Sequence, residues 1–145
     1  MRLFSLGVLA AITALLGELM LFSVFPTQSI LLLALAVPLL EELLKLILLW
    51  RGRDALPKSF SIQFFSAAFT FGLGFAIPET ILAGLADPLS NPLTLAGTLS
   101  IHLISAFFLA SAILFLMKKK PLSTFSLFIF SLSIHALYNF FIFIR

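Results

Sequence analysis

The sequence predicts an all-α bundle of membrane-spanning helices. Of its 145 residues, 61% are hydrophobic and only 10% are charged, and the mean hydropathy is +1.20. A soluble domain is about half apolar and a quarter charged, and a chain of this length cannot bury the excess. The composition therefore excludes a cytosolic enzyme, a nucleic-acid-binding module and a disordered tail. Because the chain has no cysteine, it also excludes disulfides and thiolate metal sites.

Five segments are long and apolar enough to cross a bilayer, which takes about 20 mostly apolar residues per helix. The first is too long for the apolar core of a signal peptide and has no small-residue cleavage site, so we expect it to stay in the protein. The sequence predicts one domain, residues 1–145, with spans at residues 3–25, 29–50, 59–86, 93–117 and 122–144.

The breaks between the spans hold prolines, glycines and charged residues, which are typical of turns. The first span ends at Pro26, the second at the charged run 51–54, and the third at the proline-rich segment 87–92. The fourth ends at the basic run 118–120, after which a proline opens the fifth. Pro78 lies inside the third span and has no backbone N–H, so we expect this helix to tilt or open there.

The basic residues predict the orientation. Seven of them fall at the amino terminus and in the second and fourth connections, which share one side of a five-span protein, whereas the other side carries Asp87 and Arg145. By the positive-inside rule the amino terminus is cytoplasmic and the carboxyl terminus is outside. We expect an integral, multi-pass protein of a prokaryotic cell membrane, with connections too short for a separate catalytic domain. The seven are Arg2, Arg51, Arg53, Lys58, Lys118, Lys119 and Lys120.

Seven ionisable residues nevertheless lie inside the predicted spans. A charged group at the bilayer centre costs at least about 2.5–3.5 kcal/mol, and such residues are functional-site candidates. A single one is readily explained as structural, in an ion pair or hydrogen bond between helices, but seven in five helices indicate a site. They are Glu18, Glu41, Glu42, Lys45, Glu79, His102 and His135.

Each span places its polar or small residues on one face, because successive helical residues are rotated by about 100°. Glu41, Glu42 and Lys45 share a sector, so the ammonium can offset one carboxylate while the other stays available. Counted along the helices from the outer side at ~1.5 Å per residue, the acids and histidines lie about 10–18 Å deep, which predicts one shared site. The other inward faces are Gly7, Ala11, Ala14 and Glu18; Ala68, Gly72, Ala76 and Glu79; Thr94, Thr98, His102 and Ser105; and Thr124, Ser131, His135, Tyr138 and Asn139.

Three kinds of chemistry fit these residues. Glutamate and histidine can deprotonate a water for attack on an amide, with histidine or asparagine hydrogen bonds to the oxyanion. Two histidines and a carboxylate can instead hold zinc with an open water position. The same groups can also relay protons or bind an ion in a transporter.

The order of the motifs resembles a known family. Glu-Glu-x-x-Lys at 41–45 is followed by Gly-Leu-Gly-Phe-Ala-x-x-Glu at 72–79, by His102 on the next helix, and by His-Ala-Leu-Tyr-Asn-Phe at 135–140. Between about Pro38 and Phe140 this order is similar to the PrsW-type intramembrane proteases, relatives of the CAAX prenyl endopeptidases and the wider Abi (CPBP) group. The first helix adds nothing to the resemblance. Asparagine stands at 139, where PrsW-like sequences often have aspartate.

The resemblance implies roles for the site residues. Glu41 and Glu42 would supply the catalytic carboxylate, with Glu41 the first choice for activating water, and Glu79 or His102 would assist. His135 and Asn139 would stabilise the oxyanion. Lys45 and Glu18 are supporting residues, and the family motifs do not explain Glu18, which would line the same cavity or pair with Lys45.

We therefore expect an intramembrane endopeptidase that cleaves a membrane-embedded or membrane-tethered protein near the extracytoplasmic face. A metal-free glutamate mechanism without a cofactor is favoured; in the zinc-dependent alternative the ligands would come from Glu42, Glu79, His102 and His135. The competing hypotheses are a small ion- or proton-coupled transporter and a catalytically inactive membrane scaffold. The partners expected are the substrate and the lipid bilayer, with no nucleic acid.

Overall fold

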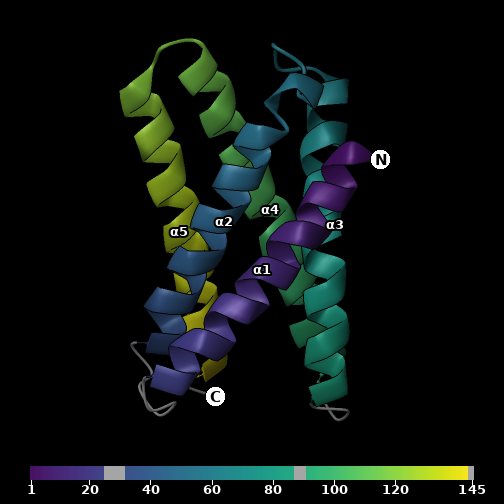
Figure 1. Cartoon of the computed structure of the whole chain (residues 1–145), viewed down its shortest axis with the longest axis vertical. Coiled ribbons are helices and arrows are strands. Elements are labelled where there is room, and N and C mark those ends of the chain that lie inside the picture. The colour runs from purple at the N-terminus through teal and green to yellow at the C-terminus, as the bar shows by residue number, and fades with distance from the viewer. Residues whose placement is uncertain (25–31, 87–90, 144–145) are drawn as a thin grey trace.

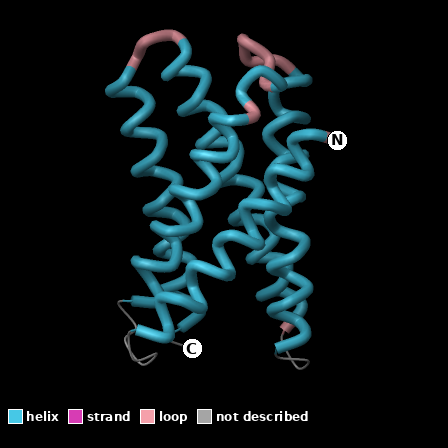
Figure 2. Tube along the Cα trace, viewed as in Figure 1, coloured by secondary structure: helices cyan, strands magenta, loops and turns pink. Residues whose placement is uncertain are grey.

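The computed structural model describes residues 1–24, 32–86 and 91–143, and in these ranges the chain is helical with no β-strand (Figure 1). Figure 2 shows loops only at the two ends of the bundle. The expected span ends at 25, 29–31 and 144, and the charged residues Asp87 and Arg145, lie outside the described ranges. The α-helices are α1 (Arg2–Val24), α2 (Val37–Arg51), α3 (Ile62–Ala86), α4 (Pro92–Met117) and α5 (Pro121–Phe143).

Four of these helices, α1, α3, α4 and α5, are long and apolar enough to cross a membrane, as the sequence predicts. The second predicted span differs, because α2 has only 15 α-helical residues and follows a π-helical turn, Leu32–Ala36. Pro38 lies in the first turn of α2 and has no N–H to bond the carbonyl of Ala34, so the regular α-helical pattern begins only beside it. The structure thus confirms an all-α bundle of five helices, four of them candidate spans.

The helix α2 lies against most of the bundle. It contacts α1, α4 and α5, while α1 packs on α3, α3 on α4 and α4 on α5. In Figure 1 α2 runs between α5 on one side and α1 and α3 on the other, with α4 behind it. Side chains on the inner face of α2 therefore meet residues from distant parts of the chain.

The helices α1 and α3 approach each other backbone to backbone. A Cβ at Gly7 would overlap the carbonyl oxygen of Phe71, and a Cβ at Gly74 would overlap that of Phe4. Small residues allow such contacts between membrane helices, and the expected small faces of both helices are buried, including Ala11 and Ala68. The helix α3 continues through Pro78, so the expected opening there does not occur; packing against neighbouring helices lets a helix keep an internal proline.

The distribution of polarity on α2 is the reverse of that on a soluble helix. Its exposed positions include the apolar residues Leu39, Leu43 and Ile47, whereas Glu41, Glu42 and Lys45 are buried. A soluble protein almost never buries such groups while exposing leucines along the same helix. This arrangement suits an apolar surrounding, in agreement with the candidate spans.

The two ends of the bundle differ in charge. Arg2 begins α1 and donates a hydrogen bond to the carbonyl of Arg51 at the end of α2, 3.3 Å away. The basic run 118–120 follows α4 at the same end of the bundle, the upper end in Figure 1. The end of α1 and the start of α4 lie at the opposite end. The predicted collection of basic residues on one side is therefore present in the fold.

Candidate functional site

Glu42 is completely enclosed by hydrogen-bond donors. Its carboxylate accepts from Lys45 Nζ at 2.8 Å, from Ser105 Oγ at 2.7 Å to each oxygen and from Ser131 Oγ at 2.7 Å, and His135 Nδ1 lies 2.9 Å away. These partners come from α2, α4 and α5. A carboxylate offers about four lone-pair positions, so Glu42 has no acceptor capacity left for a water or a metal.

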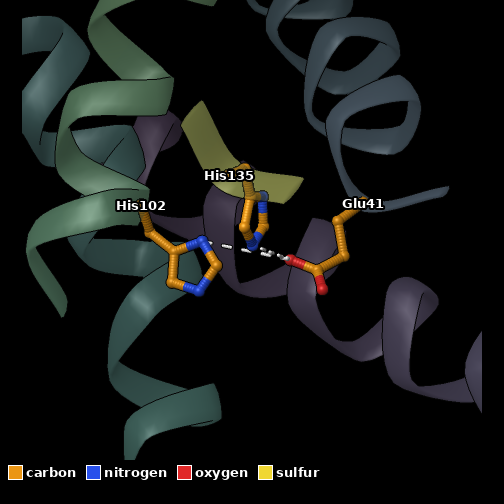
Figure 3. A group of neighbouring side chains, drawn as sticks. All are labelled: Glu41, His102 and His135. Carbon is orange, nitrogen blue, oxygen red and sulfur yellow. Dashed lines mark ion pairs between the residues drawn. The ribbon is translucent and has the colours of Figure 1, made fainter. Parts of the chain in front are cut away.

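Glu41, the adjacent residue, has the opposite surroundings. Its side chain is only 2% exposed, yet Oε2 has no hydrogen-bond partner among the described residues. The nearest cationic or nitrogen groups are Lys45 Nζ at 3.6 Å, His135 Nε2 at 3.7 Å and His102 Nδ1 at 3.9 Å, all beyond hydrogen-bond length. Figure 3 shows Glu41 and the two histidines pointing toward one another. Lys45 is thus closest to Glu42, and its ion pair with Glu41 is the longer one.

The hydrogen-bond network assigns the tautomer of each histidine. Lys45 Nζ lies 2.9 Å from His102 Nδ1, and an ammonium can only donate, so Nδ1 accepts and Nε2 carries the proton. Glu79 Oε2 is 2.5 Å from Nε2, a close contact without hydrogen-bond geometry. The Glu42 carboxylate can only accept, so the proton of His135 lies on Nδ1. The bond made by one ring nitrogen determines the state of the other, so the tautomer of His135 that donates from Nδ1 has the lone pair of Nε2 on the side of Glu41.

The ring packing holds this arrangement. The His102 and His135 rings meet edge to face with centroids 4.9 Å apart. Phe75 lies beside His102 at 4.9 Å, and the ammonium of Lys45 is 4.0 Å from the centre of the same phenylalanine ring. A cation over an aromatic face is attracted by the ring quadrupole. The buried lysine is therefore held by both glutamates and by an aromatic ring.

A cavity of about 370 Å³ lies next to the cluster. Of the predicted site residues, Glu18, Glu41, Glu79, His102 and Asn139 line it, whereas Glu42, Lys45 and His135 are not among its lining residues. Glu18 was expected either to pair with Lys45 or to line the cavity. Lys45 forms its ion pairs with Glu41 and Glu42, and Glu18 lies on the cavity wall. The remaining lining residues are Phe22, Val37, Ala83, Thr98, Tyr138 and Ile142.

The serines that enclose Glu42 lie on the polar faces predicted from the sequence, but the sequence pattern assigns them no role. Ser105 is three residues after His102 and Ser131 is four before His135, spacings that put each serine on the same helix face as its histidine. Tyr138 also lies on a predicted polar face and bonds a neighbouring helix: its hydroxyl donates to the Thr94 carbonyl at 2.8 Å. Helical spacing was the signal that could have identified them as partners.

One group of side chains could approach a metal ion. Glu41, His102 and His135 each offer a ligand atom, and these atoms lie within 4.8 Å of one another. The carboxylate of this group is Glu41, whereas the zinc-dependent alternative predicted from the sequence would take its carboxylate ligands from Glu42 and Glu79. The fit to zinc is poor, because His102 Nδ1 already accepts from Lys45 Nζ and the ammonium would repel a dication at the same point.

The comparisons with known proteins add no assignment. No family model, no curated protein and no solved structure matches the chain. The basis for a functional proposal is therefore the geometry of the polar cluster and its cavity.

Proposed function

We propose that the chain is a metal-free intramembrane endopeptidase in which Glu41 and His135 activate a water. The observation that carries the proposal is the unpartnered Glu41 Oε2, which lies 3.7 Å from His135 Nε2 and belongs to a side chain that lines a cavity. Both atoms are acceptors, so one water between them can donate a proton to each. A positioned base of this kind contributes about 10²–10⁴-fold to a hydrolysis.

The reaction follows from these positions. The water gives one proton to the Glu41–His135 pair while its oxygen bonds to the carbonyl carbon of the substrate peptide. The tetrahedral oxyanion accepts a hydrogen bond from the Asn139 amide. Its collapse breaks the C–N bond, and the proton passes to the leaving amine. The resemblance implies that His135 stabilises the oxyanion. Its hydrogen bond from Nδ1 to Glu42 instead favours a role as a base through Nε2.

The proposal includes a membrane orientation. The π-helical turn and α2 together cover 20 residues, residues 32–51, enough to cross a bilayer beside the other four helices. The basic end of the bundle is cytoplasmic by the positive-inside rule. The cavity then lies toward the extracytoplasmic end, because Glu18 and Glu79 are each about 10 Å from the ends of α1 and α3 on that side. Cleavage would occur in the outer half of the membrane.

The central test is cleavage of membrane-tethered peptides by the purified protein in vesicles, with new termini identified by mass spectrometry. Glu41→Gln and His135→Ala should each lower kcat/KM by at least about 100-fold and leave the helical circular dichroism unchanged. Leu43→Ala, an exposed position on α2, is the matched control and should retain activity. Full cleavage by both site variants would overturn the proposal, and ion flux through the vesicles without cleavage would favour the transporter.

The metal-free mechanism has its own test. Because Lys45 Nζ occupies the acceptor atom of His102, we expect activity to survive a strong chelator and dialysis. Loss of activity that zinc alone restores would instead establish the zinc-dependent alternative.

A further inference from the structure

Glu18 is one of the two acidic residues of the cavity, with Glu79, that the proposed reaction does not use. It lies on α1, half-buried, six residues before the helix ends. Its side chain lines the cavity together with Glu41 and Glu79. Glu18 and Glu79 also line a second, narrower space between α1 and α3. Two carboxylates from different helices therefore border the same gap.

The cavity wall is rich in carboxyl groups. Among the described residues, three glutamates line it and no lysine or arginine does, while Lys45 is fully buried in its pairs with Glu41 and Glu42. Independently of this count, Glu41 Oε2 has no hydrogen-bond partner although its side chain is 2% exposed. The cluster therefore leaves an acceptor unsatisfied at the cavity, where charges interact more strongly than in water.

The cavity also has an apolar outer part. Counting ~1.5 Å per residue from the helix ends, Glu18 and Glu79 lie about 10 Å deep, and Glu41 about 14 Å from the start of the π-helical turn. Phe22 and Val37 lie closer to that end of the bundle and line the same cavity. A group that enters from this end meets apolar side chains first, then Glu18 and Glu79, and then Glu41.

We propose that Glu18 and Glu79 form a subsite for a lysine or arginine side chain of the substrate, next to the bond cleaved; this rests on the proposed function. Lysine and arginine combine a long aliphatic stem with a cationic head, which matches an apolar outer part and an acidic interior. One residue of extended chain spans about 3.3–3.6 Å, so the difference in depth of about 4 Å between Glu18 and Glu41 along the bundle corresponds to one or two residues of the substrate.

The test compares tethered peptides that differ only in carrying lysine, glutamine or glutamate at the positions flanking the cleaved bond. The wild-type protein should cleave the lysine peptide about 10- to 100-fold more efficiently than the glutamine peptide, as expected for a charge-assisted contact. Glu18→Gln should remove most of this ratio. Glu18→Lys should prefer the glutamate peptide. Leu19→Gln, on the exposed side of α1, is the control and should keep the wild-type ratio.

Binding separates failure of the subsite from failure of the proposed function. Affinities of the same peptides for the Glu41→Gln variant, measured by fluorescence anisotropy, should show the lysine preference without any cleavage, and Glu18→Gln/Glu41→Gln should lose it. Equal affinities for lysine and glutamine peptides would overturn the subsite even where the wild type cleaves both. A lysine preference in binding, with no cleavage by the wild type, would retain the subsite and overturn the protease.

Discussion

Glu41 and Glu42 are neighbours on α2 with opposite surroundings. Glu42 is held by donors from α2, α4 and α5 at 2.7–2.9 Å, whereas Glu41 keeps an oxygen without a partner beside the cavity. One residue turns the side chain by about 100° around the helix axis, which is enough to move it from the contact with α4 and α5 to the cavity wall. Two identical side chains on neighbouring positions therefore differ completely in their hydrogen bonding.

The difference has an energetic basis. A buried ion costs several kcal/mol in lost solvation, which is recovered only where the geometry and additional hydrogen bonds are good. Glu42 meets this condition and ties three helices together. Glu41 does not, because its Oε2 has no hydrogen-bond partner among the described residues.

The largest expected effect comes from removing the enclosed carboxylate. Glu42→Ala leaves Lys45 buried without its nearest partner, and we expect the free energy of unfolding to fall by about 3–5 kcal/mol. Glu41→Ala should cost clearly less, because its oxygen lacks hydrogen-bond partners in the folded protein. Unfolding titrations in detergent micelles measure both, with Asp54→Ala at an exposed position as the control. Equal losses for the two glutamates would contradict the comparison.

The serines offer a finer test of the enclosed side. Ser105→Ala or Ser131→Ala should each lower the free energy of unfolding by about 1–3 kcal/mol, because a buried acceptor loses a donor. The loss of unfolding free energy in the double variant should differ from the sum of the two single losses, because both serines bond the same carboxylate. Ser100→Ala is the matched control, because that serine is exposed and bonds only the Ala96 carbonyl within its own helix. If Ser100→Ala lowers the free energy of unfolding as much as Ser105→Ala or Ser131→Ala, the hydrogen bonds to Glu42 do not account for the losses.

The smallest effect is expected at the cavity wall. Tyr138→Phe removes the hydroxyl that bonds the Thr94 carbonyl at 2.8 Å and lies 3.1 Å from Thr98 Oγ1. The ring itself stays, so we expect a loss of only about 0.5–1.5 kcal/mol in the free energy of unfolding. A double-mutant cycle with Thr98→Val measures the coupling between the two hydroxyls; additive losses would show that they do not interact.

Much of the architecture could be predicted from local sequence. Span length and helical spacing depend on residues close in the chain, so the five helices, the shared sector of Glu41, Glu42 and Lys45, and the small faces around Gly7 and Ala68 were accessible. The short α-helical part of α2 was not, although Pro38 was a signal for it. The continuity of α3 through Pro78 also depended on its neighbours rather than on the proline.

The sequence by itself determined which residues face inward, and only the tertiary structure decided how they divide. Ser105, Ser131 and His135 lie 63, 89 and 93 residues from Glu42 along the chain, so no local pattern could tell that Glu42, and not Glu41, receives their hydrogen bonds. The place of Glu18 on the cavity wall likewise follows from the packing of α1 against α3. Helical periodicity sets the direction of a side chain. Whether a hydrogen bond forms between distant helices depends on differences of a few tenths of an ångström in atomic separation, and only the packed bundle defines these.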